Sequence, residues 1–115
     1  MQYMLLIATS ETIEATMDQT TLSEIIAAYG PYTDAMIDAG VLVAGQRLRD
    51  STTATTVSIR DGKTSVLDGP YAETKEQLGG FYIIEVPDLD TAISWAARCP
   101  SAHIGSIEVR PIWPM

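Results

Sequence analysis

Apolar positions along the chain follow two different periods, and each period predicts one kind of element. Residues 3–8 form a short, unbroken apolar run, which is typical of a strand covered on both faces or nearly so. In two longer segments apolar residues return every three or four positions, as on one face of a helix. The predicted strands cover residues 3–8, 41–48, 53–60, 63–66, 81–86 and 104–112. The predicted helices lie between the first two strands and between the last two.

The first predicted helix begins with a capping-box sequence. Thr21 and Glu24 can satisfy free amides of its first turn through their side-chain oxygens. Pro31 cannot donate a hydrogen bond to the carbonyl of Ala27, so we expect a kink there, and Gly40 ends the helix. The apolar stripe comprises Leu22, Ile25, Ile26, Tyr29, Thr33, Met36 and Ile37.

The second predicted helix starts at Asp88, a good N-cap residue, and stops before Pro100. Its core stripe is predicted at Leu89, Ala92, Ile93, Ala96 and Ala97. At 100° per residue, Trp95 points about 130° away from the centre of that stripe. We therefore expect Trp95 outside the core, as a surface anchor for another protein or folded under a loop.

The order of elements is β-α-β, a hairpin, and β-α-β. Asp61-Gly62 is a strong two-residue turn signal because both positions need a positive φ. Two amphipathic helices can bury their stripes on one face of a mainly antiparallel sheet, which predicts an α+β, ferredoxin-like βαββαβ sandwich with an extra β-hairpin. The other sheet face would stay uncovered within the chain. A homodimer, with sheets packed across a two-fold axis, is the expected cover.

Composition narrows the class of protein. A chain of 115 residues with 46% hydrophobic residues predicts a single domain over residues 1–115. The net charge of −8 makes nucleic acid an unexpected partner. The single cysteine, Cys99, fits a reducing compartment. The N-terminal segment lacks the basic region of a signal peptide and is too short to span a membrane, so we expect a cytoplasmic protein without a membrane partner.

Several motifs together resemble the YCII-related proteins of the DGPF type. They are DGPYAETKE at 68–76, LGGFY at 78–82, EVRPI at 108–112, and the junction 40–48 with Gly45 and Leu48. Tyr71 stands where the name motif has Phe, and the resemblance runs from about Tyr3 to Ile112.

The resemblance implies a ferredoxin-like fold, a dimeric α/β barrel and a cleft in each subunit near the dimer interface. It also implies a genomic association of many relatives with extracytoplasmic-function sigma factors, and no settled activity. A few relatives of the wider group act on chlorinated aromatic or lactone-like substrates through a His–Asp pair. Tyr29 occupies the position of that histidine here, and a tyrosine would need its pKa lowered by several units to act as a base near neutral pH.

The Asp-Gly-Pro-Tyr turn is the most conspicuous candidate site. As a structural element it would aim Tyr71 and Glu73 at the sheet edge. As a functional element it would form a cleft wall in which Asp68 or Glu73 ionises beside a ligand. The structural interpretation is favoured from the residues alone.

Four further candidates for a ligand cleft lie near the first helix and the next strand. Tyr29 belongs to the apolar stripe and is expected in the core, whereas Tyr32 lies at the edge of the stripe and is the better ligand candidate. Asp34 follows Pro31 and either points into a cleft or sits on a solvated face. Arg47 either pairs with a ligand carboxylate or forms a structural ion pair.

His103 is the only histidine, and it is either an exposed loop residue or a general acid–base. With one histidine and one cysteine, we expect no metal site and no cofactor. Cys99 is expected to pack at a helix end. There is no phosphate loop, GxGxxG, GxSxG or HExxH motif.

Two functions remain open. The first is a dimeric small-molecule-binding or regulatory module, with a functional link to a sigma factor. The second is a cofactor-free enzyme, of the isomerase or dehydrohalogenase kind, acting on a small cyclic or aromatic compound. The enzyme needs a usable base and the binding module does not. Tyr29 at the histidine position therefore favours the first function.

Overall fold

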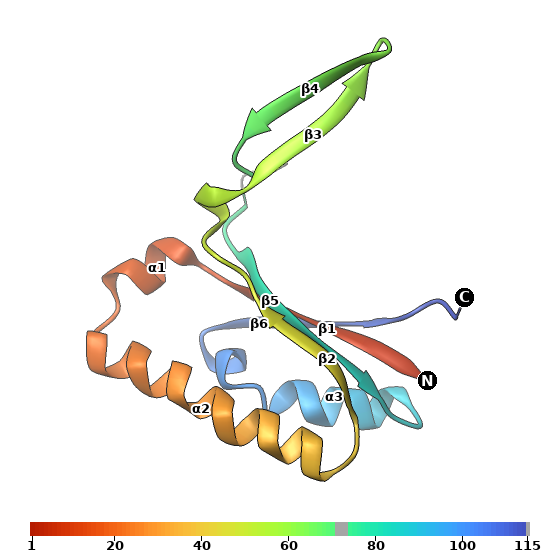
Figure 1. Cartoon of the computed structure of the whole chain (residues 1–115). Helices are drawn as coiled ribbons and strands as arrows, with labels where there is room; N and C mark the ends of the chain where they lie inside the picture. The colour runs from red at the N-terminus through yellow and green to blue at the C-terminus, as the bar shows by residue number, and fades with distance from the viewer. Residues whose placement is uncertain (71–73, 115) are drawn as a thin grey trace.

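A four-stranded antiparallel sheet forms the centre of the molecule. The computed structural model describes residues 1–70 and 74–114. The strands are β1 (Gln2–Thr9), β2 (Leu42–Arg47), β5 (Gln77–Glu85) and β6 (Gly105–Pro111), in the order β2-β5-β1-β6 (Figure 1). Leu5 of β1 lies opposite Tyr82 of β5 and Val109 of β6. This topology is compatible with the predicted ferredoxin-like sandwich.

The helices lie on one face of this sheet (Figure 1). They are α1 (Glu11–Thr16), α2 (Gln19–Asp38) and α3 (Leu89–Ala97), with short 3-10 turns η1 (Ser51–Thr53) and η2 (Pro100–His103). None of the helices in the described part of the chain is long and apolar enough to cross a membrane. The two-layer α+β arrangement agrees with the prediction, and α1 is an addition to it.

The predicted start of the long helix was wrong by three residues, since the capping box had placed the N-cap at Thr21. Asp18 is the N-cap, and its carboxylate accepts a hydrogen bond from the Thr21 amide. An aspartate before the capping-box sequence competes for the same free amides and lengthens the helix at its N-terminus. The helix then continues through Pro31 to Asp38.

The core lies between the helices and the odd-numbered side of β1. Tyr3, Leu5 and Ile7 point into it, and Met36 and Ile84 are fully buried. The rest of the buried apolar cluster is Tyr32, Val86, Ala92, Trp95, Ala96 and Cys99. Alternation along β1 therefore sorts its side chains into a covered and an uncovered face.

Two predictions about core residues were wrong. Trp95 is buried, whereas Leu89 and Ile93 of the predicted stripe are exposed. The buried stripe of α3 is Ala92, Trp95, Ala96 and then Cys99, which has the same helical spacing rotated by part of a turn. The rotation follows from α2: the Tyr32 ring lies 6.3 Å from the Trp95 ring, so α3 packs against a helix as well as the sheet.

Tyr32 is the second correction, because it belongs to the core and does not lie at the exposed edge of the helix. Its hydroxyl donates a hydrogen bond of 2.7 Å to the Trp95 carbonyl, and its ring meets the ring of Tyr82 edge to face. The Arg98 guanidinium lies 4.3 Å from the centre of the Trp95 ring. A cation over the indole face stabilises the buried position of Trp95.

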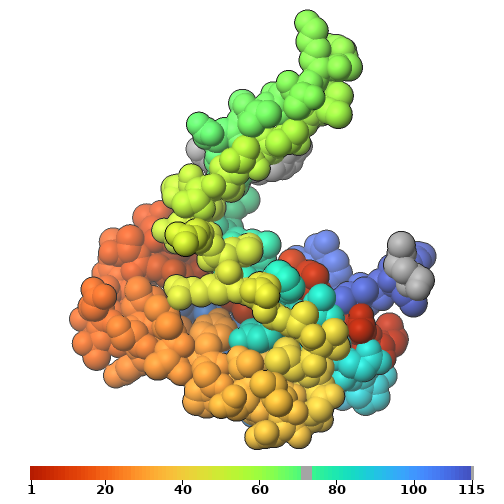
Figure 2. Space-filling model, viewed as in Figure 1, coloured from red at the N-terminus to blue at the C-terminus, as the bar shows by residue number. Residues whose placement is uncertain are grey.

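The extra hairpin forms a separate arm. Strands β3 (Thr55–Arg60) and β4 (Lys63–Asp68) pair only with each other and project away from the sandwich (Figures 1 and 2). Asp61 and Gly62 both have positive φ, as the turn prediction required. Val57, Ile59 and Val66 share one face of the arm and are exposed.

The sheet face away from the helices is also apolar. Met4, Leu6, Phe81 and Ile83 lie in its centre and are half-buried by their neighbours in the sheet. At its edge, Glu108 and Arg110 form an ion pair. No element of the described residues covers this face.

Candidate functional site

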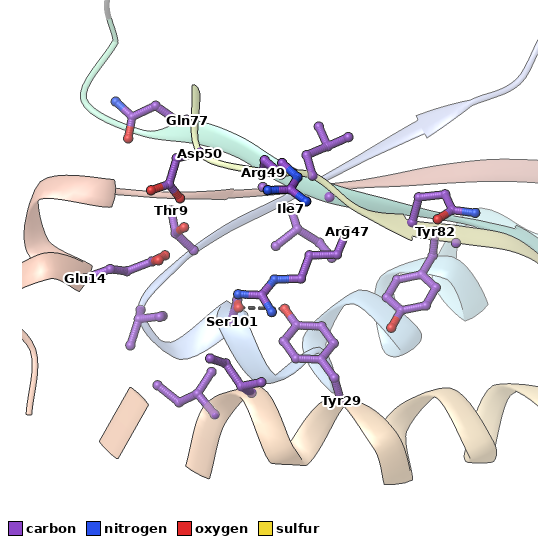
Figure 3. A pocket seen from close by; sticks show the side chains of 18 of the residues that line it. Ile7, Thr9, Glu14, Tyr29, Arg47, Arg49, Asp50, Gln77, Tyr82 and Ser101 are labelled. Carbon is purple, nitrogen blue, oxygen red and sulfur yellow. Dashed lines mark hydrogen bonds between the residues drawn. The ribbon is translucent and has the colours of Figure 1, made fainter. Parts of the chain in front are cut away.

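A cavity of about 390 Å³ lies between the helix-facing side of the sheet and helices α1 and α2 (Figure 3). A cavity of this size accommodates a small organic molecule. Its apolar lining consists of Ile7, Leu22, Ile25, Ile26, Leu42, Leu48 and Ile104. Polar side chains converge on it from β2, β5, α2 and η2.

Two glycines allow the strands and rings beside the cavity to approach closely. A Cβ on Gly45 would lie 2.6 Å from a ring carbon of Tyr82, so only glycine lets that ring lie over β2. A Cβ on Gly80 would lie 2.8 Å from the carbonyl oxygen of Gln46. Gly79 has ordinary space around it, so of the Gly79-Gly80 pair only Gly80 is required by packing.

Tyr29 is the central polar group of the cavity. Its hydroxyl donates a hydrogen bond of 2.6 Å to Ser101 Oγ and lies 3.4 Å from Cys99 Sγ. Burial is the main cause that raises the pKa of Tyr29 above its usual value. Tyr29 is therefore neutral near pH 7 and acts as a hydrogen-bonding group, not as a base.

A second hydroxyl pair lies farther along the same wall. The hydroxyls of Thr33 and Tyr82 are 2.8 Å apart, which ties α2 to β5. Burial raises the pKa of Tyr82 as well. Two hydroxyls share one hydrogen bond, so this pair retains one proton that can be donated to a ligand.

Two arginines reach the cavity from the end of β2. Arg47 lies opposite Gly80, and its side chain points across the cavity towards Tyr29 and Ser101 (Figure 3). Arg49 follows on the same rim. Within residues 1–70 and 74–114, neither guanidinium forms an ion pair with a carboxylate. Both charges are thus available to an anion.

Acidic residues lie at the α1 end of the cavity. The Glu11 carboxylate accepts hydrogen bonds from the Ser51 amide (2.7 Å) and hydroxyl (3.0 Å), so it holds α1 to η1. Gln77 accepts a hydrogen bond of 2.9 Å from the Glu11 amide. Glu14 and Asp50 line the cavity beside them (Figure 3).

The structure brings together only part of the predicted site. Tyr29, expected in the core, and Arg47 both line the cavity. Asp34 is exposed on α2 and Asp68 is exposed at the end of β4; neither lines the cavity. His103 is exposed and lines a separate shallow groove between α2 and η2. Tyr71 and Glu73 lie outside the described residues.

Thr33, Arg49, Tyr82 and Ser101 line the cavity but were not predicted as site residues. Tyr82 had a usable signal, because alternation along residues 81–86 places it on the same side as Ile84. Ser101 had none, since its position depends on a 3-10 turn.

Cys99 is buried in the floor behind Tyr29, and burial raises the pKa of its thiol. A raised pKa leaves little thiolate at neutral pH, in agreement with a packing role. In the part of the chain that the structure describes, no group of three His, Cys, Asp or Glu side chains is placed to hold a metal ion.

Comparison with known proteins finds a family and a similar bacterial protein. The YCII-related domain matches residues 1–115. An uncharacterized protein of Rhizobium meliloti (strain 1021) is 46% identical over 78 residues, which cover 66% of this chain. The match spans 63% of the length of that relative.

Proposed function

The chain belongs to the YCII-related family, and we propose that it is a small-molecule-binding module whose ligand occupies the cavity between the sheet and α2. The observation that carries this proposal is one apolar chamber into which Arg47, Tyr29 and Ser101 converge. Apolar walls with a few convergent polar groups are the usual form of a ligand site.

The same geometry favours binding over the alternative, a cofactor-free isomerase or dehydrohalogenase. Such an enzyme needs a base beside the reacting carbon. Tyr29 stays protonated near neutral pH, and His103 lies in the other groove. The carboxylates of the cavity lie at its α1 end, and Glu11 is engaged with Ser51.

Filling the cavity tests the binding proposal. Ile26 lines the cavity and is partly exposed, so Ile26→Trp should obstruct the chamber without unfolding α2. Ile37→Trp is the matched control, because Ile37 is an exposed isoleucine on the same helix and does not line the cavity. Small aromatic and alicyclic compounds can be screened by saturation-transfer NMR. Compounds that show saturation transfer from the native protein should show none from Ile26→Trp and should still show it from Ile37→Trp. Equal signals with both variants would place binding elsewhere.

We also propose that a second copy covers the open sheet face. The centre of that face is apolar, and its edge carries the opposite charges of Glu108 and Arg110, so two-fold packing can pair charges of opposite sign. Sedimentation at micromolar concentration should then give about twice 12.5 kDa. Ile83→Lys, in the middle of the face, should give monomers, and Leu89→Lys on the exposed side of α3 should not. A native monomer would refute the dimer.

A regulatory role beside a sigma factor stays a prediction from the family resemblance. If it holds, binding of the ligand in the cavity would control the activity of the sigma factor. Ile26→Trp, which obstructs the cavity, would then abolish the response of transcription to the ligand. The measurement is transcription from a promoter that the sigma factor recognises, compared between cells that carry Ile26→Trp and cells that carry Ile37→Trp.

A further inference from the structure

We propose that the ligand of the cavity carries a carboxylate, which pairs with Arg47 and accepts a hydrogen bond from Ser101, while its hydrocarbon part lies against Ile25 and Ile26. This inference rests on the proposed binding function and adds the chemical class of the ligand.

Arg47 is placed for this pairing by the register of the sheet. It lies two residues after Gly45 on the helix-facing side of β2, opposite Gly80, which has no side chain to block it. Its side chain therefore extends over the cavity and reaches towards Tyr29 and Ser101 (Figure 3). The planar guanidinium matches a carboxylate with two parallel hydrogen bonds.

The hydrogen-bond donors at the inner end of the cavity also suit an anionic ligand. Tyr29 gives its only proton to Ser101, so the Ser101 hydroxyl has a proton left to donate. Ser101 is buried and lines the cavity, and it accepts but donates no side-chain hydrogen bond within the described residues. Arg47 and Ser101 thus present donors to the same place, and a buried donor without an acceptor is costly.

The charges are separated along the cavity. Arg47 reaches the Tyr29 end, whereas Glu14 and Asp50 lie towards α1 (Figure 3). Solvent screens charges that do not touch, so direct contact with the guanidinium outweighs the more distant carboxylates. Leu22, Ile25 and Ile26 line the same cavity, and their side chains suit a ring or a short hydrocarbon chain.

Three probes of nearly equal shape test the inference by calorimetric titration: benzoate, neutral benzamide and cationic benzamidine. We expect benzoate to bind about tenfold more tightly than benzamide, as one charge-assisted pair predicts, and benzamidine to bind no better than benzamide. Arg47→Met should weaken benzoate by about the same factor and leave benzamide within about twofold.

Two control variants separate pairing from general charge. Arg49→Met removes a positive charge from the same rim and should change benzoate binding less than Arg47→Met. Arg60→Met removes an exposed charge at the tip of the arm and should change nothing.

The outcomes distinguish this inference from the binding proposal. Equal affinity for benzoate and benzamide, or equal losses in Arg47→Met and Arg49→Met, overturns the carboxylate inference while cavity binding stands. If benzamidine binds more tightly than benzoate and benzamide, the cavity prefers a cationic ligand, which would pair with Glu14 and Asp50. Absence of binding by all three probes at millimolar concentration overturns both proposals.

Discussion

The sandwich and the arm are built from the same kind of strand, but their apolar side chains are buried in the sandwich and exposed in the arm. In β1, Leu5 is 1% exposed because helices cover its face. In β3, Val57 alternates in the same way and is 60% exposed, since β3 pairs only with β4 and the arm projects away from the sandwich (Figure 2). An alternating pattern therefore marks an apolar face, and whether that face is covered depends on what else packs there.

The two tryptophans give the largest expected contrast between a covered and an uncovered position. Trp95 is 8% exposed in the sandwich, whereas Trp113 is 84% exposed after β6. Trp95→Ala should lower the free energy of unfolding by about 3–5 kcal/mol because it leaves a cavity beside Tyr32. Trp113→Ala should change it by less than about 0.5 kcal/mol. Urea unfolding measures both, and similar losses would contradict the assignment of Trp95 to the core.

Paired truncations in the two regions test the comparison itself. Leu5→Ala should cost about 2–5 kcal/mol, as is usual for a fully buried leucine. Val57→Ala, at an exposed position of the arm, should cost less than about 0.5 kcal/mol. A cost of several kcal/mol for Val57→Ala, at the same protein concentration, would show that the arm is covered in solution.

Alkaline pH should destabilise the sandwich through its tyrosines. Burial raises the pKa values of Tyr29, Tyr32 and Tyr82 above 10, so the folded protein keeps protons that the unfolded chain loses. Stability is then unchanged below about pH 10, the ordinary tyrosine value, and falls as the pH rises beyond it. Urea midpoints between pH 8 and 11.5 measure the fall, and Tyr29→Phe should make it shallower. The same slope with Tyr29→Phe would refute a raised pKa at Tyr29.

The smallest effect concerns local opening. Amide hydrogens of the β3–β4 ladder should exchange faster than those of β1, because the arm is a two-stranded hairpin whose apolar side chains Val57, Ile59 and Val66 are exposed. Hydrogen exchange followed by NMR compares Val57 with Leu5 at the same pH. Equal protection would mean that the arm opens only when the whole molecule unfolds.

Most of the fold could be predicted, while the candidate site could be predicted only in part. Apolar periods located the strands, and the Asp61-Gly62 turn defined the register of the arm. On α2 the two tyrosines exchanged their expected places: Tyr32 is in the core and Tyr29 lines the cavity. Tyr29 belongs to the predicted stripe and Tyr32 lies at its edge, so a rotation of the helix by part of a turn decides which of them enters the core.

The sequence by itself determined the strands, the two main helices, the turn of the arm and the family, because period, turn chemistry and motif are local properties of the chain. Only the tertiary structure decided which stripe of α3 is buried, that Arg47, Tyr29 and Ser101 line one cavity, and that the arm projects away from the sandwich. These properties depend on contacts between residues far apart in the chain, such as Tyr29 with Ser101. Such contacts follow from how helices settle on the sheet, and side-chain volumes such as those of Trp95 and Tyr32 set that arrangement.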